Sequence, residues 1–272
     1  MSDDPGQESG LDAEFDAMAG WVAEAVCTRG DRYAVPAACR GTGGPRVLTW
    51  LLDRMAMAPG TTLLDVGAGL GGPAAFARDR DRVRPVLLEP EPAAARAAAD
   101  LFGMPVARAD AEHLPLRDNG FDAVWALGVL CTTPHQADLV AELARVVRPG
   151  GAVGLMVLVT PKDEALVAPT GNVFPPVTEV ERMVRAAGLV IQDAAEIPVD
   201  DPLPRDWAEA EATVLEEMER RHGDHAAYRA AREQEALMGD LVAHGLVRRL
   251  LLAAHRQPGH PMGGSGCGRA AL

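Results

Sequence analysis

A buried strand that runs into a helix through a glycine-rich turn constrains this chain more than any other feature. The turn lies in Leu63–Gly72, where an apolar stretch is followed by four glycines within six residues. Glycines at this density let the backbone approach a ligand without obstruction from Cβ atoms. Beyond the turn, short apolar runs alternate with helical stretches rich in alanine and charge, which is typical of parallel βαβ units. The sequence therefore predicts an α/β fold with a mostly parallel sheet.

Hydrophobic periodicity predicts where the elements of this fold lie. We expect strands at residues 62–66, 83–88, 105–108, 121–127, 152–158, 189–197 and 247–254. We expect helices at residues 11–28, 45–57, 72–80, 91–101, 135–147, 177–187, 207–221 and 224–243. In the helix at 207–221, the spacing places Ala208, Ala212, Leu215 and Met218 on an inward face and Glu217 outside it.

Charge and composition exclude several kinds of partner. The chain has 272 residues, with 26 basic and 39 acidic side chains, and its net charge of -13 repels phosphate backbones and anionic membranes. The longest apolar run, 152–159, is too short to span a membrane. Residues 1–10 are polar and acidic, unlike a secretory signal. We therefore expect a cytoplasmic protein with no nucleic-acid or membrane partner.

The cysteines give no sign of a metal site or a disulfide framework. Cys27, Cys39, Cys131 and Cys267 are far apart, with no C-x-x-C pair and no histidine at metal-ligand spacing. We therefore expect reduced thiols and no bound metal.

The glycine turn by itself fits two kinds of cofactor. Gly67, Gly69 and Gly72 satisfy the G-x-G-x-x-G pattern of dinucleotide-binding folds, and Glu89 follows the next strand, where an acid holds ribose hydroxyls. An NAD(P)-dependent oxidoreductase is therefore one alternative. Asp65 favours a different cofactor, because its carboxylate would repel a pyrophosphate but attract the cationic end of an amino acid.

Three further motifs follow the turn. Asp110 comes after a short strand, Phe121–Trp125 forms the next strand, and Arg148–Gly151 leads into a fifth. In this order and spacing, the four motifs resemble the class I S-adenosylmethionine-dependent methyltransferase family, in its small-molecule branch of quinone-biosynthesis and natural-product enzymes. The likeness is strongest over residues 63–159, and a similar layout extends over 45–255. It implies a Rossmann-like, seven-stranded, mostly parallel sheet with helices on both faces, N-terminal helices and a helical lid insertion.

The resemblance implies how S-adenosylmethionine, whose product is S-adenosylhomocysteine, would be held. Gly67, Ala68 and Gly69 match the loop beneath the methionyl part, and Asp65 matches the acid that orients this loop and the ammonium group. Glu89, followed by Pro90, occupies the position where a carboxylate accepts both ribose hydroxyls.

Two further strand ends complete the implied cofactor site. Asp110 resembles the acid that accepts from the adenine amino group, with the Ala111 N–H facing the ring, and Leu127 and Gly128 resemble the backbone beside the sulfonium. Acids at strand ends can instead cap the next helix, which leaves Glu91 as an alternative to Glu89.

Methyl transfer from a sulfonium needs no dedicated catalytic motif, because the leaving group is already activated and alignment supplies most of the rate. His135 is the candidate general base, although capping the helix that follows Pro134 is the alternative role. Cys131 stands where relatives often carry histidine, and we interpret it as a packed thiol or as part of the substrate pocket. Phe15, Trp21 and Trp207 are the other candidate pocket residues.

These expectations divide the chain into five parts. They are an N-terminal helical cap (1–44), a cofactor-binding core (45–199), a helical lid insertion (200–245), the last strand of the core (246–256) and a flexible tail (257–272). We expect a monomer or homodimer that methylates a small molecule. The composition, which is rich in alanine and arginine, fits a role in secondary metabolism. A catalytically silent S-adenosylmethionine-binding protein is the third possibility.

Overall fold

One seven-stranded sheet organises the described part of the chain. The computed structural model describes residues 5–161 and 166–258, and side chains from residue 15 onward. The strands are β1 (Thr62–Val66), β2 (Arg84–Leu88), β3 (Val106–Ala107), β4 (Phe121–Leu127), β5 (Val147–Val159), β6 (Leu189–Ile197) and β7 (Arg248–Arg256). Their order is β3-β2-β1-β4-β5-β7-β6. All neighbouring pairs are parallel except those that β7 makes with β5 and β6. The predicted α/β, mostly parallel sheet is confirmed.

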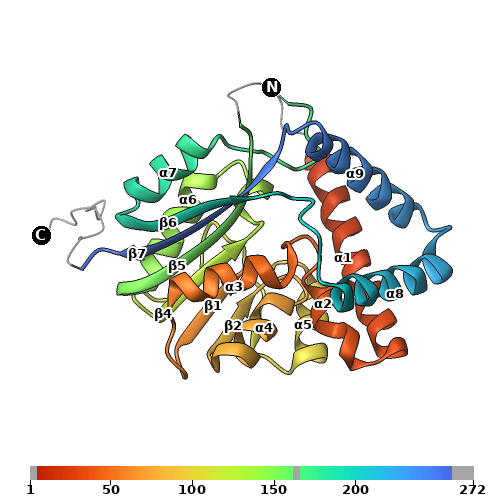
Figure 1. The fold of residues 1–272 in the computed structure, drawn as a ribbon, viewed down its shortest axis with the longest axis horizontal. Helices are drawn as coiled ribbons and strands as arrows, with labels where there is room; N and C mark the ends of the chain where they lie inside the picture. The colour runs from red at the N-terminus through yellow and green to blue at the C-terminus, as the bar shows by residue number, and fades with distance from the viewer. Residues whose placement is uncertain (1–4, 162–165, 259–272) are drawn as a thin grey trace, which may run out of the picture.

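Helices cover both faces of this sheet (Figure 1). They are α1 (Pro5–Arg29), α2 (Ala34–Ala38), α3 (Gly44–Met55), α4 (Gly72–Asp81), α5 (Pro92–Phe102), α6 (Gln136–Val146), α7 (Val177–Ala186), α8 (Arg205–His222) and α9 (Ala226–Ala243). The side chains of β1 alternate, so that Leu64 and Val66 face α6 and α7 while Leu63 faces α3 and α4. Both faces are apolar, as a parallel sheet buried on both sides requires. No helix in the described ranges is both long and apolar enough to cross a bilayer.

Most predicted elements agree with the structure within a few residues, and the differences are local. The strand predicted at 105–108 is reduced to the two residues of β3, at the edge of the sheet. The motif Arg148–Gly151, which we expect to precede the fifth strand, lies inside β5, where the pairing with β4 skips from Val147 to Ala152. Helix α2 was not expected, because five residues carry no readable periodicity. The tail predicted from residue 257 lies almost entirely outside the described residues.

Helices α1, α8 and α9 pack together beyond the edge of the sheet. Figure 1 shows α8 and α9 on the same side of the molecule as α1, away from α7. Met18 and Val22 of α1 belong to one apolar cluster with Val214 and Met218 of α8 and Tyr228 of α9. Helix α1 also reaches α5, where Asp16 Oδ1 accepts a hydrogen bond from Ala94 N at 3.3 Å. The N-terminal helix and the pair α8–α9 therefore form one continuous layer.

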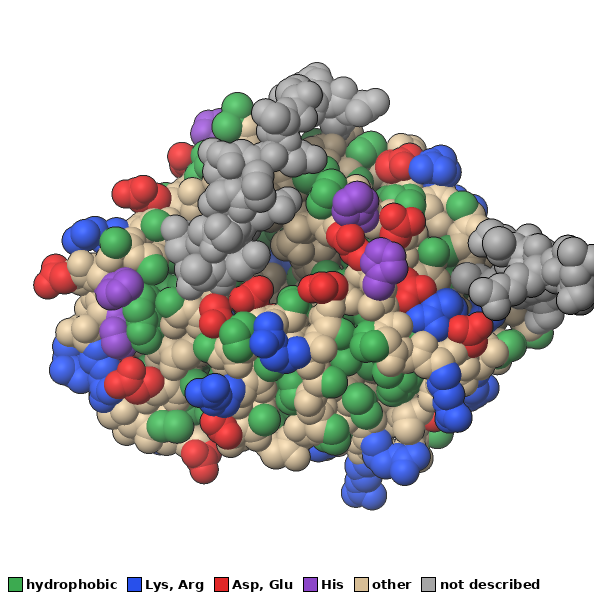
Figure 2. All heavy atoms as spheres, turned by 180° about the vertical axis from the view of Figure 1, so that it is seen from behind, with side chains coloured by type: hydrophobic (Ala, Val, Ile, Leu, Met, Phe, Trp, Pro, Cys, Tyr) green, Lys and Arg blue, Asp and Glu red, His purple; other side chains and the backbone are tan. Residues whose placement is uncertain are grey.

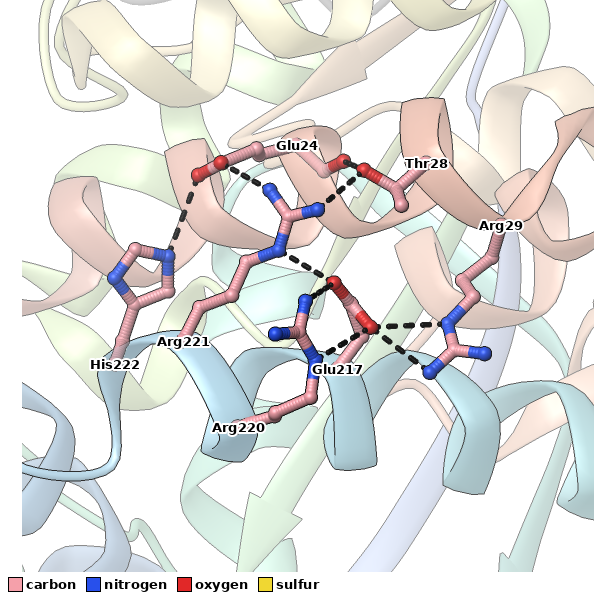
Figure 3. A network of polar contacts seen from close by, with 7 residues as sticks. All are labelled: Glu24, Thr28, Arg29, Glu217, Arg220, Arg221 and His222. Atoms are coloured by element: carbon pink, nitrogen blue, oxygen red, sulfur yellow. Dashed lines mark hydrogen bonds and ion pairs between the residues drawn. The ribbon is translucent and has the colours of Figure 1, made fainter.

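The inward face of α8 differs from the predicted one. Ala208 and Ala212 are exposed, whereas Ala210, Val214, Glu217 and Met218 are buried. The reason is that Glu217 finds its partners inside the layer. Its carboxylate accepts from Arg220 and Arg221 of the same helix and from Arg29 of α1, whose Nη2 lies 2.8 Å away (Figure 3). Arg220, and after it Arg221, lower the pKa of Glu217 to about 2.

Candidate functional site

The loops that follow β1, β2 and β4 meet at the carboxyl edge of the sheet. The amides of Gly67 and Ala68 donate to the Leu88 carbonyl at 2.9 and 3.0 Å, which ties the glycine turn to the end of β2. Gly67 has φ +67°, and a Cβ atom there would lie 2.4 Å from Cγ2 of Val129. The chain crosses from one side of β1 to the other between β3 and β4, so this edge is a topological switch point. Open α/β sheets bind their ligands at such points.

Glu89 lies buried beneath the glycine turn, with only 3% of its surface exposed. Its Oε2 accepts from the amide of Gly69 at 2.7 Å, and its Oε1 accepts from the amide of Glu91 at 3.1 Å. Burial raises the pKa of Glu89, and these two amides oppose the shift. The carboxylate thus bridges the glycine turn and the start of α5. Glu91, the alternative acid, precedes α5 and is partly exposed.

Asp65 is the second buried acid, at the end of β1. Its Oδ2 has no hydrogen-bond partner among the described residues. Burial raises its pKa to about 7, the neighbouring indole of Trp125, opposite Asp65 on β4, lowers the pKa, and the charge of Glu89 raises it. The Nε1 of Trp125 also has no hydrogen-bond partner among the described residues. An unsatisfied buried polar oxygen costs about 1–3 kcal/mol. A donor from outside the chain, and a cationic one above all, would relieve this cost.

Around the third strand, the candidate residues lie nearer to solvent. Asp110 is exposed and Ala111 is half-buried, four positions or less beyond β3. Pro90 is half-buried, and its carbonyl accepts from Arg108 Nε at 2.9 Å. Glu112, two residues after Asp110, accepts a hydrogen bond from the hydroxyl of Thr133. This bond joins the loop after β3 to the loop after β4. The sequence offered no signal for that contact, because the two residues lie in separate loops.

The loop after β4 begins at Gly128 and ends at α6. Leu127 is buried, and Gly128, with φ +86°, donates to the Met156 carbonyl at 2.8 Å. The thiol of Cys131 is buried and donates to the Gly128 carbonyl at 3.0 Å, and burial raises its pKa to about 11. Such a thiol packs as an apolar group and is not ionised at neutral pH.

His135 stands at the N-cap of α6. Its side chain is 60% exposed, and its Nδ1 lies 4.0 Å from Oδ2 of Asp138. Its backbone amide donates to Thr133 Oγ1 at 2.9 Å. The surroundings of this imidazole are those of a residue at a helix start.

The aromatic candidates lie in three different places. Phe15 Cζ would lie 3.9 Å from a Cβ atom on Gly69, so this ring covers the glycine turn. Trp21 stacks on His222, with ring centroids 4.4 Å apart, inside the layer of α1, α8 and α9. Trp207 packs edge-on against Phe76 at 5.9 Å, on the α4 side. The structure therefore brings Phe15 to the turn and places both tryptophans in packing contacts.

A cavity of about 460 Å³ opens beside Phe15, between α1, α2, the glycine turn and α9. Its lining includes Leu70, which follows Gly69, and three residues that the sequence analysis did not single out: Arg40, Gln234 and Glu235. No motif marks these three, because they belong to a linker and to a helix face that meet only in the fold.

Charged groups on the molecular surface are mixed. On the face shown in Figure 2, the basic side chains form separate groups among acidic ones. That pattern agrees with the acidic net charge of the whole chain.

Known proteins resemble this chain over its core. Residues 64–155 match a family model described as a methyltransferase domain. Methyltransferase GfsG from Streptomyces halstedii is 35% identical over 131 residues, which cover 41% of this chain and 43% of that protein. The 27-O-demethylrifamycin SV methyltransferase from Amycolatopsis mediterranei is 39% identical over 118 residues, covering 39% of this chain and 43% of the relative. The matches thus span less than half the length of these curated relatives.

Solved structures share the fold over a longer stretch. The [4+2]-cyclase SpnF superposes with a TM-score of 0.64 and 25% identity, covering 79% of this chain and 81% of that one. The geranyl diphosphate C-methyltransferase from Streptomyces coelicolor A3(2), solved with S-adenosyl-L-homocysteine, gives a TM-score of 0.58 at 19% identity, covering 77% and 74%. One architecture of sheet and helices therefore extends well beyond the segment that the family model matches.

Proposed function

We propose that this chain, whose residues 64–155 match a methyltransferase domain, is a class I S-adenosylmethionine-dependent methyltransferase that transfers a methyl group to an oxygen, nitrogen or carbon nucleophile of a small molecule. One observation carries the proposal: the buried, unpaired Oδ2 of Asp65 lies at the end of β1, beside the glycine turn and near Glu89. A cationic amino acid group fits that oxygen, because it offers the missing donor and a compensating charge.

The residues at the sheet edge fit the rest of this cofactor. In the proposed arrangement Gly67, Ala68 and Gly69 pass beneath the methionyl part. Glu89 holds the ribose hydroxyls and keeps its amide partners Gly69 and Glu91 in place, since each carboxylate oxygen accepts more than one hydrogen bond. Its burial strengthens these bonds.

The remaining cofactor contacts are assigned in the same way. Asp110 and Ala111 lie on the adenine side with Pro90 beside the ribose, and Leu127 and Gly128 border the sulfonium.

Methyl transfer requires the protein mainly to align the cofactor with the acceptor. When bound, S-adenosylmethionine would supply an activated methyl group: the acceptor would form the new bond with a lone pair on oxygen or nitrogen or a π pair on carbon, the electrons of the carbon–sulfur bond would stay on sulfur, and the acceptor's proton would leave to bulk solvent. The protein's own task is to hold the two reactants in line and to exclude water. His135 occupies the N-cap position of α6 without a side-chain capping bond, and its exposed imidazole weighs against the role of general base.

Asp65 also weighs against an NAD(P)-dependent oxidoreductase. A pyrophosphate at the glycine turn would lie near this buried carboxylate, where like charges are poorly screened. Glu89 would suit the ribose of either cofactor, so Asp65 is the residue that favours a cofactor with a cationic end.

The wider organisation of the protein follows from this proposal. Residues 45–199 and 246–256 form the cofactor-binding core, 1–44 the helical cap and 200–245 the lid, as the contiguous layer of α1, α8 and α9 supports. The protein acts in the cytoplasm, where free thiols such as those of Cys39 and Cys131 stay reduced. It acts without a nucleic-acid partner, because its charge opposes one, and as a monomer or homodimer.

Calorimetry on the full chain tests the function directly. We expect S-adenosylhomocysteine to bind with a dissociation constant in the micromolar range, a free energy of about -8 kcal/mol, and NAD to give no saturable heat. A screen of small molecules with isotope-labelled S-adenosylmethionine then tests transfer. Tight binding of NAD with no binding of S-adenosylhomocysteine would overturn the proposal.

A further inference from the structure

We infer that the cavity between α1 and α9 binds the methyl acceptor, and that this acceptor is a neutral, largely apolar small molecule. The inference rests on the proposed methyltransferase function and adds the substrate class to it. It draws on the place of the cavity, its lining and the pairing of its charges.

The cavity lies next to the proposed cofactor site without being part of it. It is bordered by Leu70, the residue after Gly69, and by Phe15, whose ring covers Gly69. In the described part of the chain, its lining includes neither Asp65 nor Glu89. A molecule held here would therefore contact the glycine turn from the side of α1 while leaving the buried acids to the cofactor.

The lining is mostly apolar and comes from elements far apart in the sequence. Its apolar part consists of Phe15, Met18, Ala19, Val22, Ala37, Ala38, Leu70, Ala231 and Met238. The volume of about 460 Å³ lies within the range of small-molecule pockets. Methionine side chains at two of these positions adapt to irregular apolar shapes.

The charged groups at the cavity pair with one another. Arg40, in the linker between α2 and α3, forms an ion pair with Glu235 of α9, which also pairs with Arg232. Burial lowers the pKa of Arg40, as does nearby Arg232, while Glu211 and Tyr228 act in the opposite direction. Glu235 thus pairs with both arginines, and Glu211 adds a second negative charge close enough to act on Arg40.

This pairing argues for a neutral ligand. A charged acceptor would compete with this half-buried ion pair and leave one of its partners uncompensated, which is unfavourable. The third polar group, Gln234, already accepts from the amide of Thr170 at 3.1 Å and so fixes α9 to the segment after β5. The polar end of the cavity therefore offers hydrogen bonds but no surplus charge.

Two fluorescent probes of similar shape test the inference on the full chain. N-Phenyl-1-naphthylamine is neutral and apolar, and 1-anilinonaphthalene-8-sulfonate carries one negative charge. We expect the neutral probe to bind saturably and at least about fivefold more tightly than the anion, and S-adenosylhomocysteine to leave its affinity within about threefold. Displacement of the neutral probe by S-adenosylhomocysteine would assign the cavity to the cofactor and overturn the inference.

Filling the cavity locates the probe. Ala231→Trp should lower the affinity for the neutral probe by about tenfold or more, because the indole occupies the volume that the probe needs. Ala236→Trp, on the exposed face of the same helix, is the matched control and should change the affinity by less than about twofold. Met238→Glu places an unpaired charge in the lining and should also weaken binding of the neutral probe. This second variant tests the cavity if the indole of Ala231→Trp disturbs folding.

Removing one charge tests the pairing. Glu235→Gln leaves Arg40 without its partner, so the anionic probe should bind about fivefold more tightly while the neutral probe changes by less than about twofold. Glu233→Gln, exposed on the same helix, should alter neither. Equal binding of both probes to the unmodified protein, or no effect of Ala231→Trp and Met238→Glu, would overturn the inference.

The two proposals fail differently. If the probes behave as expected but S-adenosylhomocysteine does not bind, the methyltransferase function is wrong and the acceptor assignment falls with it, although the ligand class of the cavity stands. If S-adenosylhomocysteine binds and the neutral probe does not, the function stands and the inference is wrong.

Discussion

At the scale of single residues, two buried acids dominate the candidate site. Glu89 is satisfied by backbone amides on both oxygens, whereas Asp65 leaves one oxygen without a partner in the described chain. The two carboxyls are close enough for the charge of Glu89 to raise the pKa of Asp65. The geometry therefore predicts different behaviour when each is replaced.

Glu89→Gln should weaken S-adenosylhomocysteine binding by about tenfold or more, because the amide loses charge-assisted bonds to two hydroxyls. Calorimetry of the purified variant measures this change. Glu91→Gln is the matched control, two residues further on and partly exposed, and should change the affinity by less than about threefold. The opposite result, a loss at Glu91 alone, would transfer the ribose role to that acid.

Asp65 predicts a pH dependence of cofactor binding. Since its pKa is raised to about 7, the carboxyl is largely protonated below that pH in the free protein and cannot pair with an ammonium group. Affinity for S-adenosylhomocysteine should therefore fall as the pH drops from 8 to 6, and binding near pH 7 should release protons. Calorimetry in buffers of different ionisation enthalpy measures that release, which Asp65→Asn should abolish.

The raised pKa of Asp65 predicts the opposite pH dependence for stability: the free energy of unfolding should fall as the pH rises. A carboxyl whose pKa is raised on folding binds more protons when folded, so its contribution to the free energy of unfolding falls as the pH rises from about 4 to about 7. Urea unfolding of the ligand-free protein at pH 8 should show that Asp65→Asn is more stable than the original chain. A less stable variant at that pH would show that the carboxylate already has a strong partner.

At the scale of elements, the docking of α8 on α1 depends on Glu217. The arginines that contact it come from α8 itself and from α1, where Arg29 is 188 residues earlier in the chain, and the two on α8, Arg220 and Arg221, lower its pKa (Figure 3). Arg221 also reaches Glu24 and Thr28 of α1, and Glu24 contacts His222. One buried carboxylate thus joins a set of contacts that fixes the angle between the two helices.

Replacing Glu217 by glutamine should lower the melting temperature at pH 7 by roughly 3–8 °C, because three arginines lose their shared partner. The pKa of Glu217 is depressed, so its contribution is complete above its ordinary value near 4.5 and disappears as the pH falls towards 2. The difference between the variant and the original chain should therefore shrink over that interval. Exposed Glu216→Gln serves as the control in the same melting experiments, and an equal loss there would refute a special role for Glu217.

At the scale of the whole molecule, the sheet edge forms the proposed cofactor site and the helical layer forms part of the proposed acceptor site. The acids and the glycine turn belong to the edge, whereas the cavity gains its outer wall from α9. Replacing residues 205–244 with a short Gly/Ser linker should keep S-adenosylhomocysteine affinity within about tenfold, because that cleft is built by the core.

The same variant should lose methyl transfer, since the acceptor is no longer held or shielded from water. Calorimetry and a labelled methyl-transfer assay measure the two properties on one preparation, and sedimentation measures its oligomeric state. Full turnover without the insertion would reject the lid. Loss of a dimer with activity intact would instead identify α8 and α9 as an interface between subunits.

Much of the core could be predicted because its signals are local. The strands at Thr62–Val66 and Phe121–Leu127 lie where the apolar runs placed them, and the acids Asp65 and Glu89 reach one edge because parallel strands end on the same side. The glycine turn is equally local, since backbone angles such as that of Gly67 depend on residue type.

The sequence alone thus determined the α/β class, the succession of motifs at the ends of the strands, and the acids of the proposed cofactor site. Only the tertiary structure decided that Glu217 points inward, that Trp21 and Trp207 are packed away from the glycine turn, and that Arg40 meets Glu235. The physical reason is range. Periodicity and turn chemistry act over a few residues, whereas a charge on one helix becomes an inward group only when a distant arginine is packed against it.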